Sequence, residues 1–322
     1  MEFTKRNHSN PCFWTAYWNL EYYNYKVHKT PIELLARQQE VFSLNVKSDK
    51  IISTPVNNVH YDKNLGVAEI TPESAKKFCK NYFPDKYEKL SKYYEEHPET
   101  LYMDFEDILN GIEKTPAYQT LISVIEKERL ETAEEKANLS CFIAIQNIRS
   151  HAILKSMIEI EKEIGVEKFE YFWILKNILS NPNSLLKLVI PIACSQWLIY
   201  RTLKHTFPLP DSPILVRNGS IMIAISPRIL IEINANIPKP EDFWLEKDYI
   251  SKSKMNEYRK RCISNTFKEI IFNDKAILEE WKKTSEFKKR MKLISNTKSY
   301  NKLVTEEENR QIWKINAFGN IY

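Results

Sequence analysis

The residues best suited to chemistry lie on one predicted helix, Leu139 to Leu154, which is apolar around most of its circumference. A helix that is apolar nearly all round is typical of a buried core element. Gln146, Arg149 and Ser150 interrupt that pattern at spacings of three and four, so their side chains share one face. Because an unpaired internal charge is very costly, a buried guanidinium needs an anionic partner. The sequence therefore predicts that a carboxylate of this chain, or a ligand, meets Arg149.

Two residues that are distant in the sequence could complete an acid–base site around that helix. Asp211 lies in the segment 207–213, whose three prolines restrict the backbone and would hold the carboxylate rigidly. His8 could exchange protons beside it. Arg149 could bind a phosphate in bidentate fashion and stabilise developing negative charge, and Gln146 could orient water or substrate. We therefore take these four as the candidate catalytic residues of a hydrolase that acts on nucleic acid or a nucleotide.

The same residues also have a purely structural interpretation. Arg149 and Asp211 could form a buried ion pair, and His8 could donate to a backbone carbonyl, which would fix the N-terminal segment without any substrate. A divalent metal could bind through Asp211 and His8, but two ligands are too few to predict a metal site, so the cofactor stays unknown. A cleft exposing Arg149 and Asp211 together would favour an enzyme, whereas an internal salt bridge would favour a non-catalytic component.

Several other patterns are discounted. Only five glycines occur and no G-x-G-x-x-G or Walker motif exists, which excludes a glycine-rich phosphate loop. His60 has no His, Cys or carboxylate at ligand spacing. Ser150 and His151 are adjacent on the predicted helix, so their side chains should point about 100° apart and not form a catalytic pair.

The charge distribution indicates a second candidate site. Residues 252–292 hold thirteen Lys/Arg and six Asp/Glu, a net charge of +7, whereas residues 85–135 hold fourteen Asp/Glu and six Lys/Arg, a net charge of −8. A basic surface suits nucleic acid, a nucleotide or an acidic partner protein. The alternative is two solvated helical faces that pair with each other. The candidate binding residues are Lys282, Lys283, Lys288, Lys289 and Arg290.

The cysteine pattern and the apolar segments indicate which cellular environment the protein suits. The five cysteines form no C-x-x-C motif, which argues against a disulfide framework or a zinc ribbon and fits a reducing interior. The N-terminus has no apolar signal core. The longest apolar stretch, 185–200, is interrupted by Lys187 and Pro191 and is too short to span a bilayer. We expect a cytoplasmic protein without a membrane partner.

Helix and turn signals divide the chain. Residues 40–54 predict a hairpin, and Thr-Pro pairs at 71–72 and 115–116 predict helix starts. Thr132-x-x-Glu135 is a capping box that should open one long helix ending at Gly165. Asn218-Gly219 predicts a tight hairpin in a β-meander over 196–235. Helices are expected over 254–272 and 273–295.

These elements predict an α+β fold that is predominantly helical, with a small antiparallel β-meander and hairpin sheet. One domain would cover residues 1–300. It would contain a helical insert at about 72–194, the meander at about 196–235 and C-terminal helices at about 254–295, followed by a tail at 301–322.

A series of short motifs resembles a bacterial family catalogued as domain of unknown function 4238. The motifs occur in the family's order over nearly the whole chain. The first is a His-x-x-Pro followed by aromatics at 8–14, then come an Asn-Val pair at 58–59 and the helix motif Phe-x-x-x-Gln-x-x-Arg at 142–149. A Trp-led strand near Trp197, a turn at 210–213 and Ser-Pro at 226–227 follow. Here Asn7 replaces the first of the family's paired histidines, and Ser212 replaces the asparagine of its turn.

The resemblance implies a shared fold and polar centre but no established activity. Relatives lying near phage-defence or toxin-like genes imply, by analogy, a nuclease-like effector in phage defence or a toxin-like system. The alternative is a non-catalytic component of such a system that binds nucleic acid or a partner protein.

Overall fold

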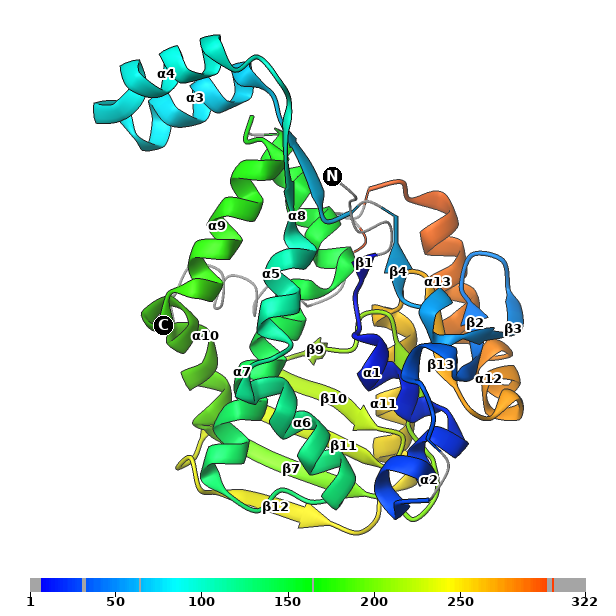
Figure 1. Ribbon diagram of the computed structural model, residues 1–322. Helices are drawn as coiled ribbons and strands as arrows, with labels where there is room; N and C mark the ends of the chain where they lie inside the picture. The colour runs from blue at the N-terminus through cyan, green and yellow to red at the C-terminus, as the bar shows by residue number, and fades with distance from the viewer. Residues whose placement is uncertain (1–6, 31–32, 64, 164, 300–302, 304–322) are drawn as a thin grey trace.

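The computed structural model describes residues 7–30, 33–63, 65–163, 165–299 and 303 (Figure 1). Helices predominate over strands in these residues, so the predicted helical α+β class is confirmed. The prediction of one small antiparallel sheet is wrong, because the strands form two larger sheets and two short two-stranded ladders. Within the described ranges, every helix is too short or too polar to cross a membrane.

The larger sheet contains the predicted meander and lies across the lower part of Figure 1. Asn218 and Gly219 both have positive φ, as an Asn-Gly hairpin requires, so that prediction is confirmed. The edge strand β12 pairs with β7 in parallel, a pairing that the meander pattern did not predict. In spatial order, the strands are β12 (Trp244–Lys247), β7 (Ser195–Arg201), β11 (Ile229–Pro238), β10 (Ser220–Ser226) and β9 (Leu215–Arg217).

The second sheet joins the predicted hairpin to two strands from the other end of the chain. Its strands, in spatial order, are β3 (Lys50–Pro55), β2 (Glu40–Asn45), β13 (Glu269–Phe272) and β8 (Leu209–Pro210). Residues 269–272 were expected in a helix, and that prediction is wrong. The helix α11 (Lys252–Asn265) stops first, and the short apolar run Ile270-Ile271-Phe272 is buried as a strand between two neighbours.

The long central helix is broken where one continuous rod was expected. Thr132 accepts the N–H of Glu135 and caps α7 (Ala133–Arg149), as predicted. Ser150 then leaves the helical conformation with ψ of 124°, and a separate helix, α8 (His151–Glu163), starts at the next residue. The hydroxyls of Ser150 and Ser212 share a hydrogen bond, so this break lies directly against the proline-rich turn.

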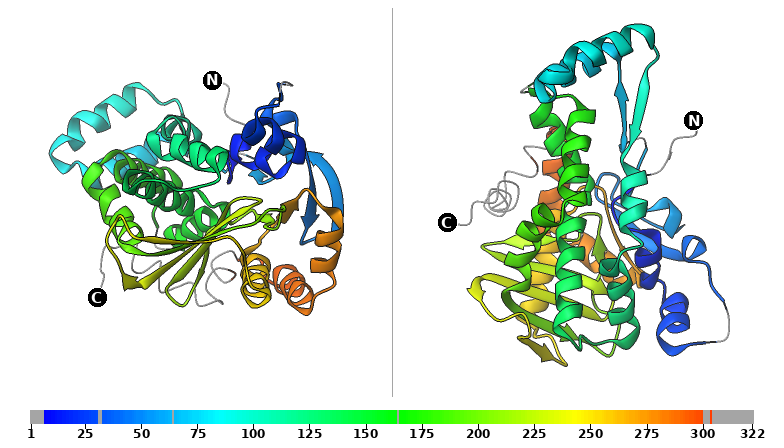
Figure 2. Two further views of the ribbon diagram at one scale, coloured as in Figure 1. Left: turned by 90° about the horizontal axis from the view of Figure 1, so that it is seen from below. Right: turned by 60° about the vertical axis from the view of Figure 1, so that its left-hand side comes forward.

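The helices are arranged around the larger sheet. In Figures 1 and 2, α6, α7 and α10 lie against one face of it, and α11 lies on the other side near β8 and β9. The helices α3 and α4 form a hairpin at the end of the β5–β6 ladder and project from the body (Figure 2). The remaining elements are β1 (Asn7–His8), α1 (Cys12–Thr15), α2 (Leu20–His28), β4 (Tyr61–Asp62), β5 (Val67–Ile70), α3 (Pro72–Tyr82), α4 (Tyr87–Glu96), β6 (Leu101–Asp104), α5 (Phe105–Ile112), α6 (Pro116–Lys127), α9 (Lys168–Ser180), α10 (Pro182–Ala193), α12 (Lys275–Lys282), α13 (Ser285–Asn296) and four short 3-10 turns at Ala16–Trp18, Ala36–Gln38, Val56–Asn58 and Pro84–Lys86.

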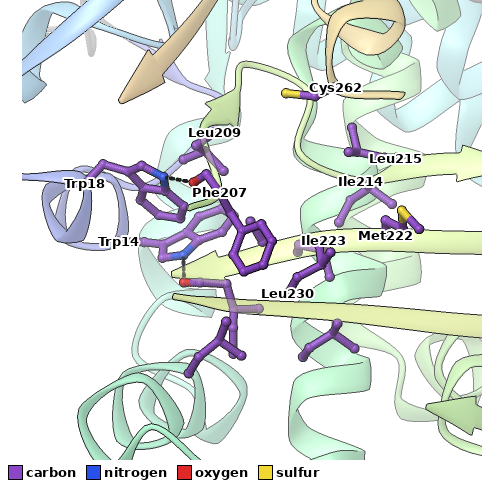
Figure 3. Packing of buried hydrophobic residues seen from close by; sticks show 14 of the residues in the cluster. Trp14, Trp18, Phe207, Leu209, Ile214, Leu215, Met222, Ile223, Leu230 and Cys262 are labelled. Atoms are coloured by element: carbon purple, nitrogen blue, oxygen red, sulfur yellow. Dashed lines mark hydrogen bonds between the residues drawn. The ribbon is translucent and has the colours of Figure 1, made fainter. Parts of the chain in front are cut away.

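Aromatic side chains fix the N-terminal segment in the core. The indole N–H of Trp14 donates to the carbonyl of Ile225 at 2.7 Å, and that of Trp18 donates to Phe207 at 2.7 Å (Figure 3). Both indoles are fully buried, where an unpaired N–H would be costly. This packing places residues 8–10 beside the turn at 207–213.

Candidate functional site

Gln146 joins three distant segments of the chain. Its amide nitrogen donates to the carbonyl of Ser9 and, at 2.9 Å, to Oδ1 of Asn10. The amide nitrogen of Asn10 lies 3.1 Å from the carbonyl of Pro210 and 2.8 Å from Nδ1 of His60. The N-terminal segment, α7 and the proline-rich turn therefore converge, as the sequence predicted. Gln146 is fully buried within this network.

Arg149 is buried and paired, which confirms that its guanidinium needs an anion of some kind. Its Nε donates to the carbonyl of His8 at 2.9 Å, Nη1 pairs with Glu113, and Nη2 lies 3.9 Å from Oε2 of Glu106. The side chain is only 3% exposed. In the part of the chain that the structure describes, Asp211 is not among its ion-pair partners, so that proposed pairing is wrong. Its donors are directed at protein groups, which is the arrangement expected of a structural ion pair.

Asp211 belongs to a second acidic group on the other side of the turn. Its Oδ1 accepts the backbone N–H of Phe267 at 3.0 Å, and its own N–H donates to the carbonyl of Glu269. Burial, with a smaller contribution from the nearby charge of Glu269, raises the pKa of Asp211 to about 7 against the opposing hydrogen bond from the N–H of Phe267. Glu269 accepts from Ser43 Oγ at 2.6 Å and from the N–H of His60 at 2.7 Å.

His8 does not pair with Asp211 among the described residues, so the predicted acid–base pair is wrong. Its Nδ1 lies 3.1 Å from the carbonyl of Val59. A carbonyl only accepts, so Nδ1 donates and Nε2 carries the lone pair. Burial, with smaller contributions from the charges of Arg149 and His151, lowers the pKa of His8 to about 4 against the opposing effect of its hydrogen bond to Val59. The ring is therefore neutral at pH 7.

The structure places the five predicted binding residues in three different environments: exposed, partly buried beside an aspartate, and buried. Lys283, Lys288 and Lys289 are exposed. Lys282 lies 3.6 Å from Asp49 in the β2–β3 turn. Arg290 is buried, donates from Nε to the carbonyl of Thr266 at 2.8 Å, and stacks on a phenylalanine ring. The prediction that Arg290 belongs to a surface cluster is wrong, because its side chain is buried against Thr266 and Phe267 instead of being exposed to solvent.

Sequence reasoning missed a group of charges at the start of α8. His151 Nδ1 lies 3.0 Å from Oδ2 of Asp62, and Lys155 Nζ lies 2.6 Å from the same oxygen. His60, which was discounted as a surface residue, is buried in the network around Asn10. One signal was available, because His151 and Lys155 are four residues apart and share a helical face. Nothing in the sequence pairs Asp62 with them.

Within the described ranges, no cluster of three or more His, Cys, Asp or Glu side chains is arranged to hold a metal ion. No family model, curated protein or solved structure matches the chain. The resemblance to the family of unknown function 4238 therefore stays an expectation.

Proposed function

We propose that this chain binds nucleic acid through a basic face made of Lys47, Lys50, Lys283, Lys288 and Lys289. The observation that carries the proposal is the state of the three helical lysines. All three are exposed, and within the described ranges no carboxylate lies at ion-pair distance from them. Ammonium groups without ion-pair partners can replace the counterions of a phosphate backbone, which is the main source of affinity for nucleic acid.

The turn of the β2–β3 hairpin extends this face. Lys282, at the end of α12, lies 3.6 Å from Asp49, and Lys47 and Lys50 flank that aspartate as exposed residues. The helix α12 packs on β2 and β3, at the outer edge of the molecule in Figure 1. The contact between Lys282 and Asp49 therefore places the hairpin turn, with Lys47 and Lys50, at the end of α12 where Lys283 follows.

Acidic side chains on the same helices only partly balance this charge. Glu280 is exposed, and Glu286 lies 3.7 Å from Lys260. Residues 252–292 keep a net charge of +7. The hydrolase built on Arg149 and Asp211 has less support, because the guanidinium is held by Glu113 and Glu106. Binding of nucleic acid by the basic face is therefore the better supported function, compared with catalysis by Arg149 and Asp211.

Replacing Lys283, Lys288 and Lys289 together with glutamine should weaken binding to labelled single-stranded RNA and duplex DNA. Fluorescence anisotropy over a series of salt concentrations gives the slope of log K against log salt concentration. This slope should be shallower by about 2 to 3 in the variant, since each phosphate contact contributes about 0.7 to 0.9 to it. The loss should be similar for unrelated base sequences, because phosphate contacts carry no sequence information.

The matched control replaces Lys86, Lys89 and Lys92, which are exposed at α4 and the turn before it, with glutamine. The net charge changes equally, but these lysines lie on the projecting helical hairpin. Binding should be nearly unaffected. Equal losses in both triple variants would show a nonspecific charge effect, and the absence of wild-type binding at low salt would overturn the proposal.

A further inference from the structure

The group of charges at the start of α8 is more open to solvent than Arg149. The side chains of Asp62, Lys155 and His151 are 28%, 23% and 11% exposed, against 3% for Arg149. A single carboxylate oxygen, Oδ2 of Asp62, lies within hydrogen-bond distance of both the imidazole and the ammonium group. Asp62 and Lys155 are thus partly accessible, His151 is mostly buried, and their contacts hold the three groups close together.

Asp62 determines which ring nitrogen of His151 carries the proton. Burial alone raises the pKa of Asp62, but hydrogen bonds and charges from His151 and Lys155 hold it well below its usual value. An ionised carboxylate can only accept, so Nδ1 of His151 donates to it and Nε2 keeps its lone pair. Burial lowers the pKa of His151 despite the opposing effect of Asp62. At neutral pH the ring is therefore an oriented base.

His8 supplies a second neutral imidazole close by. It lies opposite Tyr61 in the β1–β4 ladder, one residue before Asp62 on the paired strand. The charge of His151 acts on the pKa of His8, as expected of near neighbours. Nδ1 of His8 is held by Val59, so its Nε2 is also a hydrogen-bond acceptor.

We propose that His151, oriented by Asp62, is the general base of a phosphodiester hydrolase site, with His8 orienting the attacking water and Lys155 supplying positive charge near the phosphate. This inference rests on the proposed binding of nucleic acid. An aspartate that fixes the tautomer of a histidine base is a recurring arrangement in hydrolases.

The reaction balances without another reactant. Nε2 of His151 removes a proton from water, and the oxygen of that water forms a bond to phosphorus as the P–O bond to the leaving ribose oxygen breaks. The imidazolium then returns its proton to that oxygen, which leaves one phosphomonoester end and one hydroxyl end. Asp62 stabilises the imidazolium while it exists.

The first test measures cleavage of end-labelled single-stranded RNA, single-stranded DNA and duplex DNA by the full chain. His151→Gln should lower the cleavage rate by about 10²- to 10⁴-fold, the usual contribution of a general base, with little change in binding. Asp62→Asn should lower kcat more than it raises KM. His205→Gln is the control, because His205 is another partly buried histidine whose pKa is lowered to about 4, mainly by burial. It should cleave like wild type.

Chemical rescue separates a catalytic imidazole from a structural one. His151→Ala should regain part of its cleavage activity when free imidazole is added, whereas the His205→Ala variant should not respond. If His151→Ala is too unstable to assay, NMR of the wild-type ring nitrogens gives a second readout. It should show the Nδ1–H tautomer for His151 at pH 7, and the Nε2–H tautomer would overturn the inference.

The outcomes also separate this inference from the binding proposal. Wild-type protein that binds nucleic acid but cleaves none of the three substrates would overturn the hydrolase site and leave binding intact. Cleavage retained by His151→Gln at the wild-type rate would do the same. In the triple lysine variant, cleavage should show a raised KM and an unchanged kcat, and a wild-type chain that neither binds nor cleaves would overturn both proposals.

Discussion

Replacing Arg149 with methionine should lower the free energy of unfolding by about 3 to 5 kcal/mol, the range measured when one partner of a buried ion pair is removed. The methionine fills much of the volume but leaves Glu113 and the buried Glu106 without their cation. It also leaves the carbonyl of His8 without its donor. Urea unfolding followed by circular dichroism at pH 7 measures the difference.

Neutralising the carboxylates as well should recover most of that loss. The triple variant Arg149→Met, Glu106→Gln, Glu113→Gln removes all three charges, and uncharged replacements of buried ion pairs are often tolerated. Arg149→Lys should fall between wild type and Arg149→Met, because one ammonium cannot reproduce the fork that reaches His8 and both carboxylates. A loss below about 1 kcal/mol in Arg149→Met, or no recovery in the triple variant, would contradict the assigned ion pair.

The elements that could be predicted from sequence are those with local signals. Thr132 caps α7, and Asn218-Gly219 turns between β9 and β10, because each depends on residues within a few positions. The strand β13 lacked such a signal. Its four residues were read as part of a helix, since a short apolar run does not distinguish a buried strand from a helical segment. Only its pairing with β2 and β8 determines its conformation.

In the candidate site, too, only the features with a local sequence signal could be predicted. A buried arginine requires an anion, and that requirement could be read from α7 alone. The identity of the anion depends on tertiary packing, which places α5 beside α7. One clue was present, because Glu106 and Glu113 are seven residues apart and would share a face of a helix. Any of several acidic residues on the chain met the same description.

The expectation that Ser150 and His151 lie on one unbroken helix was wrong for a different reason. The direction of His151 relative to Ser150 was derived from an unbroken helix, and the break at Ser150 removes that relation. At the break, the hydroxyl of Ser150 shares a hydrogen bond with that of Ser212, a residue 62 positions away. The apolar pattern of residues 139–154 is that of one continuous helix, so the sequence did not indicate that a new helix starts at His151.

Asp211 should make the chain less stable as the pH rises from about 4 to about 8. Its pKa is raised to about 7 in the folded chain, mainly by burial, from a model-peptide value of 3.8. The folded state therefore keeps a proton that the unfolded state releases, and this contribution to stability is lost as the pH rises through 7. The difference of about 3 units corresponds to at most about 4 kcal/mol.

The substitution Asp211→Asn isolates this effect from other titrating groups. Because the amide is neutral and can still accept the N–H of Phe267, the variant should match wild type near pH 4 and exceed it by up to about 4 kcal/mol near pH 8. Asp62→Asn should behave in the opposite sense, since the folded pKa of Asp62 is lowered and its contribution is present at neutral pH and lost in acid. Unfolding free energies at four pH values between 4 and 8 give the Asp211 curve, and values extended below pH 4 give the Asp62 curve, because the pKa of Asp62 is lowered from the usual carboxyl value. Parallel curves for wild type and Asp211→Asn would mean that the carboxyl of Asp211 is ionised in the folded chain. Burial between the turn and β13 would then not raise its pKa.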